Sequence, residues 1–329
     1  MAEGPRIPVH VLTGFLGSGK TTLLNHLLSA GAFEDTAVIV NELGAVGLDH
    51  LLVDQRTDQI ALLEGGCLCC AVVDSLPETL LELCRRRASR ELPAFTRIVI
   101  ETTGLADPGP ITSVIRNSPL LAHFLRPGIT VTALDTTTAD QVLERHPEAV
   151  RQVVAADRLV LTKLDLRDPP DADERAALSR MNPFAEVVTR DAIEATPSGL
   201  FDAPPTGARV LPPDGGNEKA AHTHGVEAHG FDIPDPVTRA GLAAFVRALE
   251  HRLGADLLRC KGLVRTASGT VLVQGVGPRF IFTDIPEPSP AVPAHLTCIV
   301  LGRDREAVGE LIPWLYVPEG TMPPSPEEL

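Results

Sequence analysis

A glycine-rich segment near the start of the chain has the residue types and spacing that bind a nucleoside triphosphate. Residues 14–21 read GFLGSGKT and match the phosphate-binding pattern G-x-x-x-x-G-K-[ST] at every fixed position. Glycines let backbone amides approach a phosphate, the lysine ammonium reaches the outer phosphates, and the threonine hydroxyl is a ligand for Mg²⁺. We assign a catalytic role to Lys20 and Thr21. The predicted nucleotide contacts are Gly14, Gly17, Ser18, Gly19, Lys20, Thr21 and Thr22.

The tetrapeptide at residues 162–165, TKLD, indicates which base is bound. It is a variant of the N-K-x-D guanine signature, in which the carboxylate of Asp165 accepts the ring N–H and the exocyclic amino group of guanine. Lys163 can lie across the base. Thr162 stands where the signature has Asn, and the tetrapeptide alone also fits an ordinary loop at the end of a strand. Together with the upstream phosphate loop, it favours GTP or GDP over ATP.

A third segment places a carboxylate at the end of a buried strand. The apolar run at 98–100 leads into Glu101, and Gly104 follows after two threonines. From this position a P-loop enzyme approaches Mg²⁺ and the γ-phosphate, so we predict that Glu101 acts there and that the Gly104 amide senses the γ-phosphate. A capping loop with a surface Glu is the alternative. No residue has the pattern of a general base, so catalysis is expected to rest on positioning and charge neutralisation.

Three of the six cysteines lie together at residues 65–70, which read GGCLCC. Thiolates suit soft ions such as zinc or copper(I), and Cys67 and Cys70 have the C-x-x-C spacing that lets one loop supply two ligands. Cys69 and Cys70 are adjacent, so their side chains diverge unless the backbone turns. We expect two or three of these thiolates to bind one metal ion. A redox-active dithiol and simple packing remain as alternatives, although paired glycines beside three cysteines make a poor core strand.

Other residues give weaker signals. Asn41 and Glu42 follow a strand, and they fit either a switch loop with Glu42 near a metal or a simple capped turn. Three histidines in a segment predicted to be flexible could donate imidazoles to a metal, or serve no specific role: His222, His224 and His229. The remaining cysteines occur singly in helical or strand patterns and are predicted to be core residues: Cys84, Cys260 and Cys298.

Composition sets outer bounds on the function. The 329 residues are enough for two domains, and 44% hydrophobic with 22% charged residues supports globular cores. A net charge of −14 argues against nucleic acid or anionic lipid as partners. No run of about 18 apolar residues and no signal peptide occur, so we expect no membrane span and a cytoplasmic protein. Six cysteines in so long a chain are too few for a disulfide scaffold.

The elements that must position these residues alternate between strands and helices. Such alternation predicts an α/β fold with a mostly parallel sheet, helices on both faces, and ligands at the carboxyl ends of the strands. The predicted strands are Ile7–Leu12, Ala37–Val40, Gln59–Leu63, Arg97–Ile100, Gly128–Leu134, Arg158–Leu161 and Glu186–Val188. Helices are predicted at Thr22–Leu28, at Asp171–Met181, and from a capping box at residues 75–78 to Arg87.

A change in composition near residue 203 predicts a domain boundary. Residues 1–202 form the predicted nucleotide-binding domain with the cysteine motif, and 203–220 form a linker rich in Pro and Gly. Residues 221–317 are predicted to form a smaller α+β domain, with an antiparallel sheet and helices on one face. The tail at 318–329 is predicted to be disordered.

Taken in order, these motifs resemble the CobW family of P-loop GTPases. The likeness covers nearly the whole chain, includes RCKG at 259–262, and is most specific at the C-x-C-C between the two switch regions. It implies a GTP-hydrolysing metallochaperone whose nucleotide state controls metal affinity. Zinc is the implied cargo, with cobalt as a second choice. The chain departs from the family at Ala45, where a second Glu is common, and in having few histidines, so accessory metal ligands there are in doubt.

The resemblance leads to a specific functional hypothesis. GTP with Mg²⁺ is expected to order a metal site at Cys67, Cys69 and Cys70, with Thr21 and Glu42 near the metals, and hydrolysis is expected to release the ion to a client metalloprotein. The chain is expected to act as a monomer or homodimer, with slow turnover when no partner is present. The alternatives are a nucleotide-gated partner-binding module with structural or redox cysteines, and a small-molecule kinase that uses ATP.

Overall fold

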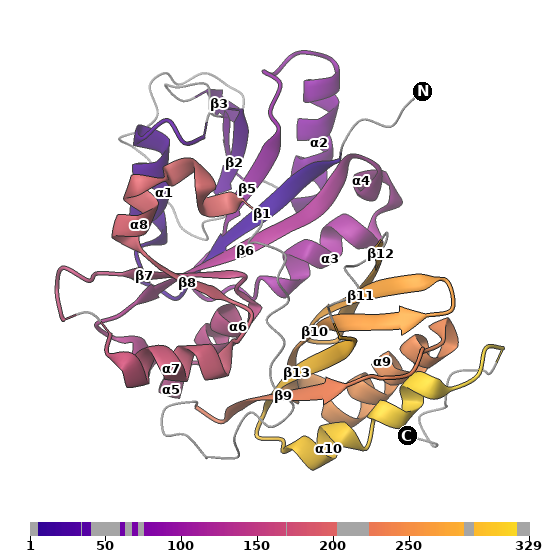
Figure 1. Ribbon diagram of the computed structural model, residues 1–329. Helices are drawn as coiled ribbons and strands as arrows, with labels where there is room; N and C mark the ends of the chain where they lie inside the picture. The colour runs from indigo at the N-terminus through magenta and orange to yellow at the C-terminus, as the bar shows by residue number, and fades with distance from the viewer. Residues whose placement is uncertain are drawn as a thin grey trace. The chain divides into compact units, whose positions relative to one another are not determined.

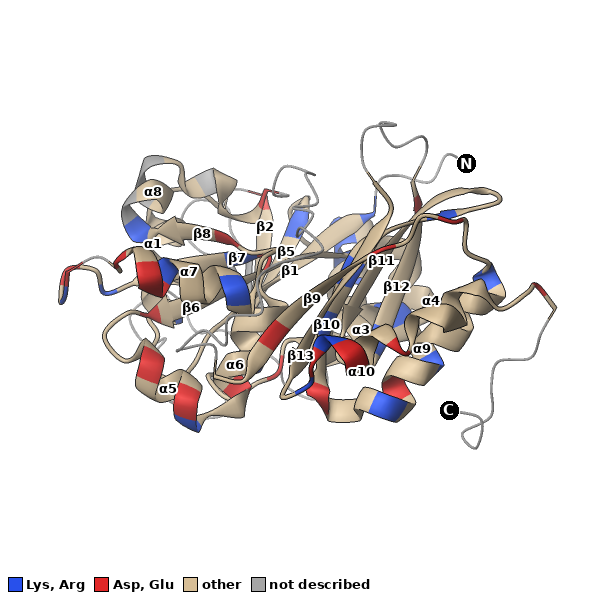
Figure 2. Cartoon of the chain, turned by 60° about the horizontal axis from the view of Figure 1, so that its bottom comes forward, with Lys and Arg blue, Asp and Glu red and all other residues tan. Residues whose placement is uncertain are grey.

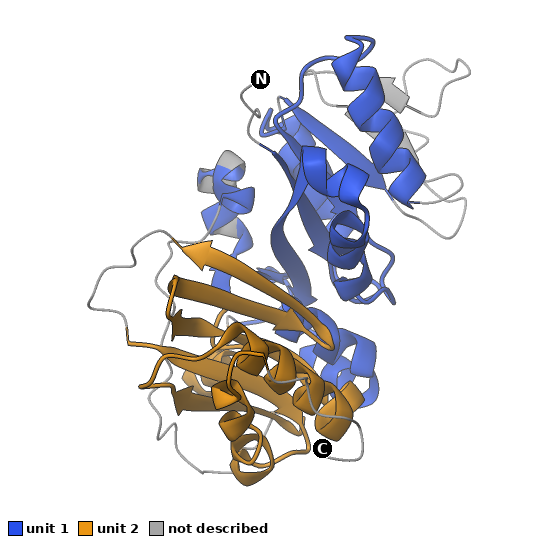
Figure 3. Cartoon of the chain, turned by 90° about the vertical axis from the view of Figure 1, so that its right-hand side faces the viewer, with its two compact units in different colours: residues 1–169, 185–206 blue, residues 170–184, 207–329 orange. Residues whose placement is uncertain are grey.

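The chain forms two compact units, which Figure 1 and Figure 3 show. The computed structural model describes residues 6–33, 35–40, 60–62, 68–71, 76–168, 170–202, 224–285 and 293–320. Unit 1 comprises Met1–Pro169 with Ala185–Thr206, and unit 2 comprises Pro170–Phe184 with Gly207–Leu329. The linker predicted at 203–220 lies outside the described residues, as does most of the predicted tail. The predicted domain limits therefore remain predictions.

Unit 1 is built on an eight-stranded sheet in the order β3-β4-β2-β5-β1-β6-β7-β8. All neighbouring strands run parallel except β3 and β4, which are antiparallel. The strands are β1 (Ile7–Thr13), β2 (Thr36–Val40), β3 (Ile60–Leu62), β4 (Leu68–Ala71), β5 (Arg97–Glu101), β6 (Leu125–Asp135), β7 (Arg158–Thr162) and β8 (Glu186–Thr189). This arrangement confirms the predicted fold class. β1 occupies the centre, between β5 and β6, so the segment after it leaves from the middle of the carboxyl edge.

Helices cover both faces of this sheet because alternate strand residues are apolar on each side. In β2, Ala37 and Ile39 pack on one face with α2, α3 and α4, whereas Val38 and Val40 pack on the other with α1 (Figure 1). The helices are α1 (Lys20–Ser29), α2 (Leu76–Ala88), α3 (Gly109–Asn117), α4 (Pro119–Phe124), α5 (Ala139–Arg145), α6 (Pro147–Ala155) and α8 (Arg190–Ala195), with a 3₁₀ turn at Pro197–Phe201. β1 contributes to both cores, with Val9 and Val11 on one face and Leu12 on the other.

Unit 2 is an antiparallel sheet with helices against one face, in the strand order β12-β11-β10-β13-β9. Its core packs the sheet against α9 (Arg239–Leu253), α10 (Arg305–Gly309) and the last 3₁₀ turn (Ile312–Tyr316). The strands are β9 (Val226–Asp232), β10 (Leu257–Thr266), β11 (Gly269–Val276), β12 (Arg279–Ile285) and β13 (His295–Leu301), with a 3₁₀ turn at Gly254–Asp256. The antiparallel α+β prediction is confirmed.

Helix α7 (Ala172–Met181) lies between β7 and β8 in sequence but groups with unit 2. It begins with a capping box between Asp171 and Glu174 and packs against β9. The ring of Phe184 lies 5.6 Å from the Arg259 guanidinium carbon and 5.4 Å from the Lys261 Nζ. The chain therefore enters unit 2 at Pro170, soon after β7, and returns to unit 1 for β8.

The structure corrects one sequence interpretation and confirms another. Residues 68–71 of the cysteine motif form strand β4, paired with β2 and β3, although the motif was interpreted as a loop. The three singly placed cysteines are buried, as predicted.

Within the described part of the chain, every helix is too short or too polar to cross a membrane. Charged residues mark the outer helices, including acidic ones on α5 and both signs on α9 (Figure 2).

Candidate nucleotide-binding site

The phosphate loop joins the end of β1 to the start of α1. Its three glycines adopt positive φ angles, +145° at Gly14, +73° at Gly17 and +86° at Gly19. A side chain is strained at each of these values. At Gly14 an added Cβ atom would also lie 2.3 Å from the Ala133 carbonyl oxygen of β6. The loop therefore requires glycine for both backbone conformation and space.

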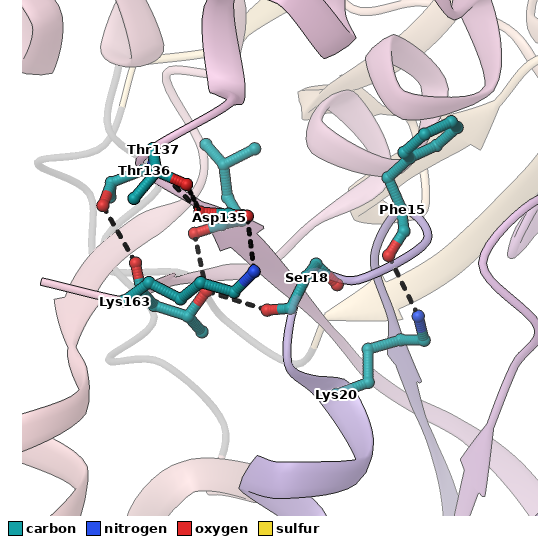
Figure 4. A network of polar contacts seen from close by, with 9 residues as sticks. Phe15, Ser18, Lys20, Asp135, Thr136, Thr137 and Lys163 are labelled. Atoms are coloured by element: carbon teal, nitrogen blue, oxygen red, sulfur yellow. Dashed lines mark hydrogen bonds and ion pairs between the residues drawn. The ribbon is translucent and has the colours of Figure 1, made fainter. Parts of the chain in front are cut away.

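Lys20 and Ser18 are buried in this loop. The Lys20 ammonium donates to the Gly14 carbonyl at 2.8 Å. It also donates to the Phe15 carbonyl at 3.1 Å (Figure 4). The Ser18 hydroxyl is also buried, and it has no hydrogen-bond partner among the described residues. A charged donor and an unsatisfied hydroxyl in a loop of left-handed glycines suit a polyphosphate ligand.

The residues predicted to hold Mg²⁺ meet at the carboxyl edge of the sheet. The Thr21 hydroxyl, at the start of α1, donates to a carboxylate oxygen of Glu101 at 2.7 Å. Glu101 ends β5 and is 3% exposed. A hydroxyl and a carboxylate in contact are hard oxygen donors, which Mg²⁺ prefers. This pair therefore fits the ion.

The segment after Glu101 lies directly on the phosphate loop. An added Cβ atom on Gly104 would be 2.6 Å from the Leu16 amide nitrogen and 2.8 Å from the Leu16 Cα. The Thr102 hydroxyl donates to the Thr13 hydroxyl at 2.8 Å, which ties the segment to the last residue of β1. Only a glycine permits this approach, so the predicted γ-phosphate sensor and the phosphate loop are in backbone contact.

The segment at 162–165, which is predicted to recognise the base, is fixed to the phosphate loop by Thr162. Its hydroxyl donates to the Ser18 carbonyl at 2.8 Å and also lies 3.1 Å from the Leu134 carbonyl oxygen. Thr162 is 5% exposed at the end of β7. A threonine in the Asn position of the signature therefore connects this segment to the predicted phosphate-binding loop.

Lys163 and Asp135 form an ion pair beside this connection. The Lys163 ammonium is 2.8 Å from a carboxylate oxygen of Asp135, and Lys163 has a φ of +57° (Figure 4). Burial raises the pKa of Asp135, but hydrogen bonds from Lys163 and Thr137 outweigh that effect and hold the pKa below its usual value. The ion pair fixes the Lys163 stem, whereas Asp165 is exposed two residues further on.

Some predicted site residues lie outside the described residues. These are Asn41, Glu42, Cys67 and His222; for Cys69 and Cys70 only the backbone, in β4, is described. His229 lies in β9, with its Nε2 3.0 Å from the Arg303 carbonyl oxygen. Among the residues whose side chains are described, no three His, Cys, Asp or Glu lie close enough to hold a metal ion.

The sequence analysis missed two residues that contact the predicted site. Asp135 ends β6 at the same carboxyl edge, and a polar residue closing a buried strand was the available signal. Gln152 lies in α6, and its amide nitrogen donates to the Gly104 carbonyl at 3.1 Å and the Ala106 carbonyl at 3.0 Å. No local motif marks Gln152, because the fold alone brings α6 to this segment.

A mostly parallel sheet that carries a phosphate loop after β1 and a guanine-type loop after β7 is the arrangement of a P-loop GTPase. The chain belongs to the CobW/HypB/UreG family. A model of the CobW/HypB/UreG nucleotide-binding domain matches residues 8–189. A model of the cobalamin synthesis protein cobW C-terminal domain matches residues 226–312. The resemblance stated from the motifs is thereby confirmed.

Named relatives match from about half to nearly all of the chain. The chain is 40% identical to the zinc chaperone YjiA of Escherichia coli over 185 residues, which cover 56% of this chain and 57% of that protein. It is 26% identical to zinc-regulated GTPase metalloprotein activator 1 of Schizosaccharomyces pombe, over 93% of this chain and 84% of that protein. The crystal structure of Zn(II)-bound YjiA GTPase from E. coli superposes with a TM-score of 0.71 at 29% identity, covering 95% of this chain and all of that one.

Proposed function

We propose that this GTPase carries zinc at Cys67, Cys69 and Cys70 and transfers it to a client metalloprotein, with the bound nucleotide setting the affinity for the ion. Two relatives are named for zinc and for chaperone or activator functions. Thiolates are ligands that zinc prefers. Cobalt is a second ion that the same donors accept.

The observation that carries the coupling is one row of residues across three neighbouring strands. Val40 in β2 is in register with Ala71 in β4 on one side and with Glu101 in β5 on the other. Neighbouring strands lie about 5 Å apart, so the backbone that follows the cysteine pair is roughly 10 Å from Glu101. The cysteine strand thus ends level with the carboxylate that contacts Thr21, which gives the nucleotide site a short path to the metal site.

Each part of the nucleotide site has a proposed task. Thr21 and Glu101 hold Mg²⁺, which would neutralise charge on the β- and γ-phosphates when bound. Lys20 moves from the loop carbonyls to the outer phosphates, and the Gly104 amide distinguishes GTP from GDP. Asp165 selects guanine. GTP therefore changes the carboxyl edge of the sheet near Glu101. A ligand that binds two conformations with different affinities shifts the equilibrium between them.

The test is a zinc titration in two nucleotide states. The protein, freed of metal, is loaded either with a non-hydrolysable GTP analogue and Mg²⁺ or with GDP, and zinc affinity is measured with a competing chromophoric chelator. We expect tighter binding with the GTP analogue. The variants Cys67→Ser, Cys69→Ser and Cys70→Ser identify the ligands. Loss of a true ligand abolishes the difference in zinc affinity between the two nucleotide states. A parallel cobalt titration establishes metal preference.

A matched control is available in α2. Cys84 is buried there, and burial raises the pKa of its thiol to about 11, so it remains protonated and is a poor zinc ligand. Cys84→Ala should keep the wild-type difference between nucleotide states. Equal zinc affinity in both states would refute the coupling. One zinc ion that exchanges in neither state would favour the alternative, a nucleotide-gated partner-binding module with structural cysteines.

A further inference from the structure

Helix α6 contacts both parts of the nucleotide site that surround the γ-phosphate position. At its N-cap, the ring of His146 packs on the ring of Phe15 in the phosphate loop, with centroids 4.4 Å apart. Two turns later, the amide of Gln152 reaches the segment that carries Gly104. The same rigid helix therefore touches the phosphate loop and the predicted γ-phosphate sensor.

Gln152 binds the sensor segment at two points. Its Nε2 donates to the carbonyls of Gly104 and Ala106, on either side of Leu105. Because both acceptors are carbonyl oxygens, the amide orientation is determined by its partners. The Gln152 backbone carbonyl in turn accepts a hydrogen bond from the Thr132 hydroxyl of β6 at 2.8 Å. Gln152 is thus hydrogen-bonded both through its backbone carbonyl and through its side-chain amide.

Packing alone does not account for a glutamine at this position. The side chain is 1% exposed, and the other buried residues of α6 are Ala149, Val150, Val153, Val154 and Ala155. Its Oε1 is buried with no hydrogen-bond partner among the described residues. An unsatisfied buried acceptor costs stability. An apolar side chain of the same length avoids that cost, so the two donated hydrogen bonds are the feature that requires glutamine.

We infer that Gln152 is a positioning residue for GTP hydrolysis, which holds the Gly104 backbone against the phosphate loop where the γ-phosphate is read. The inference rests on the proposed role of Gly104. GDP lacks the γ-phosphate, so Gln152 affects the GTP-bound and transition states more than the GDP-bound state. Loss of two neutral hydrogen bonds is expected to lower kcat by about tenfold to thirtyfold.

The test compares variants of equal length. Gln152→Met removes the donors and the unsatisfied acceptor together, and Gln141→Met on the exposed face of α5 is its control. For Gln152→Met we expect a folded protein with a modestly lower melting temperature, because the Gly104 and Ala106 carbonyls lose their donor. We also expect the lower kcat, weaker binding of a non-hydrolysable GTP analogue, and GDP affinity within about twofold. A kcat within twofold of wild type in the folded variant would overturn the inference. If Gln152→Met does not fold, Gln152→Asn keeps the amide but shortens its reach, and a wild-type kcat there overturns it equally.

A pH profile separates positioning from packing. In Gln152→Glu the ionised carboxylate faces two carbonyl oxygens, whereas the protonated carboxyl donates one O–H to them. Its kcat relative to wild type should therefore rise as the pH falls, and a flat ratio contradicts the inference. Gly104→Ala, measured in parallel, separates the two proposals. Unchanged kcat in Gly104→Ala defeats the sensor role, whereas loss there with normal Gln152→Met defeats only the inference.

Discussion

His10 makes the stability of unit 1 depend on pH in a calculable way. It lies in β1, three residues before Thr13, and its Nδ1 accepts a hydrogen bond from the Ile129 amide at 3.1 Å. Burial lowers the pKa of His10 to about 3, with further lowering by Arg97 and Arg126 and a partial offset by Asp157. The ring is therefore neutral in the folded protein at pH 5 and above.

The sign of the effect follows from comparing the folded and unfolded states. The pKa of histidine in the unfolded chain is about 6.5, so below that pH the unfolded state binds a proton that the folded state does not. Stability from this group is complete above pH 6.5 and is lost as the pH falls toward 3. From pH 7 to pH 5 the loss in free energy of unfolding is about 2 kcal/mol. The value depends on the unfolded pKa, because the folded pKa is far below this window.

The assay is denaturant unfolding at pH 7 and pH 5 for wild type and His10→Asn. Asparagine retains an acceptor near the Nδ1 position but does not titrate, and it loses the ring contact with Phe201. Far-UV circular dichroism is the suitable signal, since the one tryptophan, Trp314, reports on unit 2. The difference between the two proteins should shrink by about 2 kcal/mol from pH 7 to pH 5. A difference constant to within about 0.5 kcal/mol would refute the assignment.

Three further predictions concern the nucleotide site. Thr162→Val removes the hydrogen bond to the Ser18 carbonyl and should weaken GDP binding about fivefold by calorimetry, whereas Thr162→Ser should stay within about twofold. Asp165→Asn should change the base preference from guanine to xanthine, measured as displacement of bound GDP by xanthosine triphosphate. An unchanged preference for GTP would contradict the role of Asp165. Glu101→Gln should make nucleotide affinity nearly independent of Mg²⁺, measured with and without a magnesium chelator, and a wild-type Mg²⁺ dependence would exclude Glu101 from the ion's environment.

The sequence predicts most of the sheet because its strands are short apolar runs with clear boundaries. β6 is the instructive exception, since it begins at Leu125 rather than at the predicted Gly128. Pro127 lowers the strand signal because proline cannot donate to a ladder. The structure accommodates it at a register shift between Val9 and Val11 of β1. Strand β4 escaped prediction for a different reason, since its pairing with β2 and β3 is tertiary and paired glycines precede it in sequence.

Part of the candidate site is predicted by local sequence patterns and part only by the fold. Residues with a local motif, such as the phosphate loop and the segment at 162–165, are recognised from the sequence. Asp135 and Gln152 come from β6 and α6, and only the fold brings Asp135 to Lys163 and Gln152 to the Gly104 carbonyl. The sequence predicts no individual ranges for helices α3 to α6, so nothing in it places Gln152 near Gly104.

Contacts from three different elements hold the phosphate loop. Thr162 donates to the Ser18 carbonyl from the predicted base side, Gly104 lies on the Leu16 backbone from the predicted γ-phosphate side, and His146 packs on Phe15. Each contact involves a different residue of one short loop with constrained glycines. Because such a loop has few alternative conformations, a change at the base contact alters the same backbone that the γ-phosphate sensor touches. Base recognition and γ-phosphate recognition should therefore be energetically coupled. In a double-mutant cycle of Thr162→Val and Gln152→Met, the effects on GTP-analogue affinity should be non-additive. Additive effects would show that the loop does not couple the two contacts.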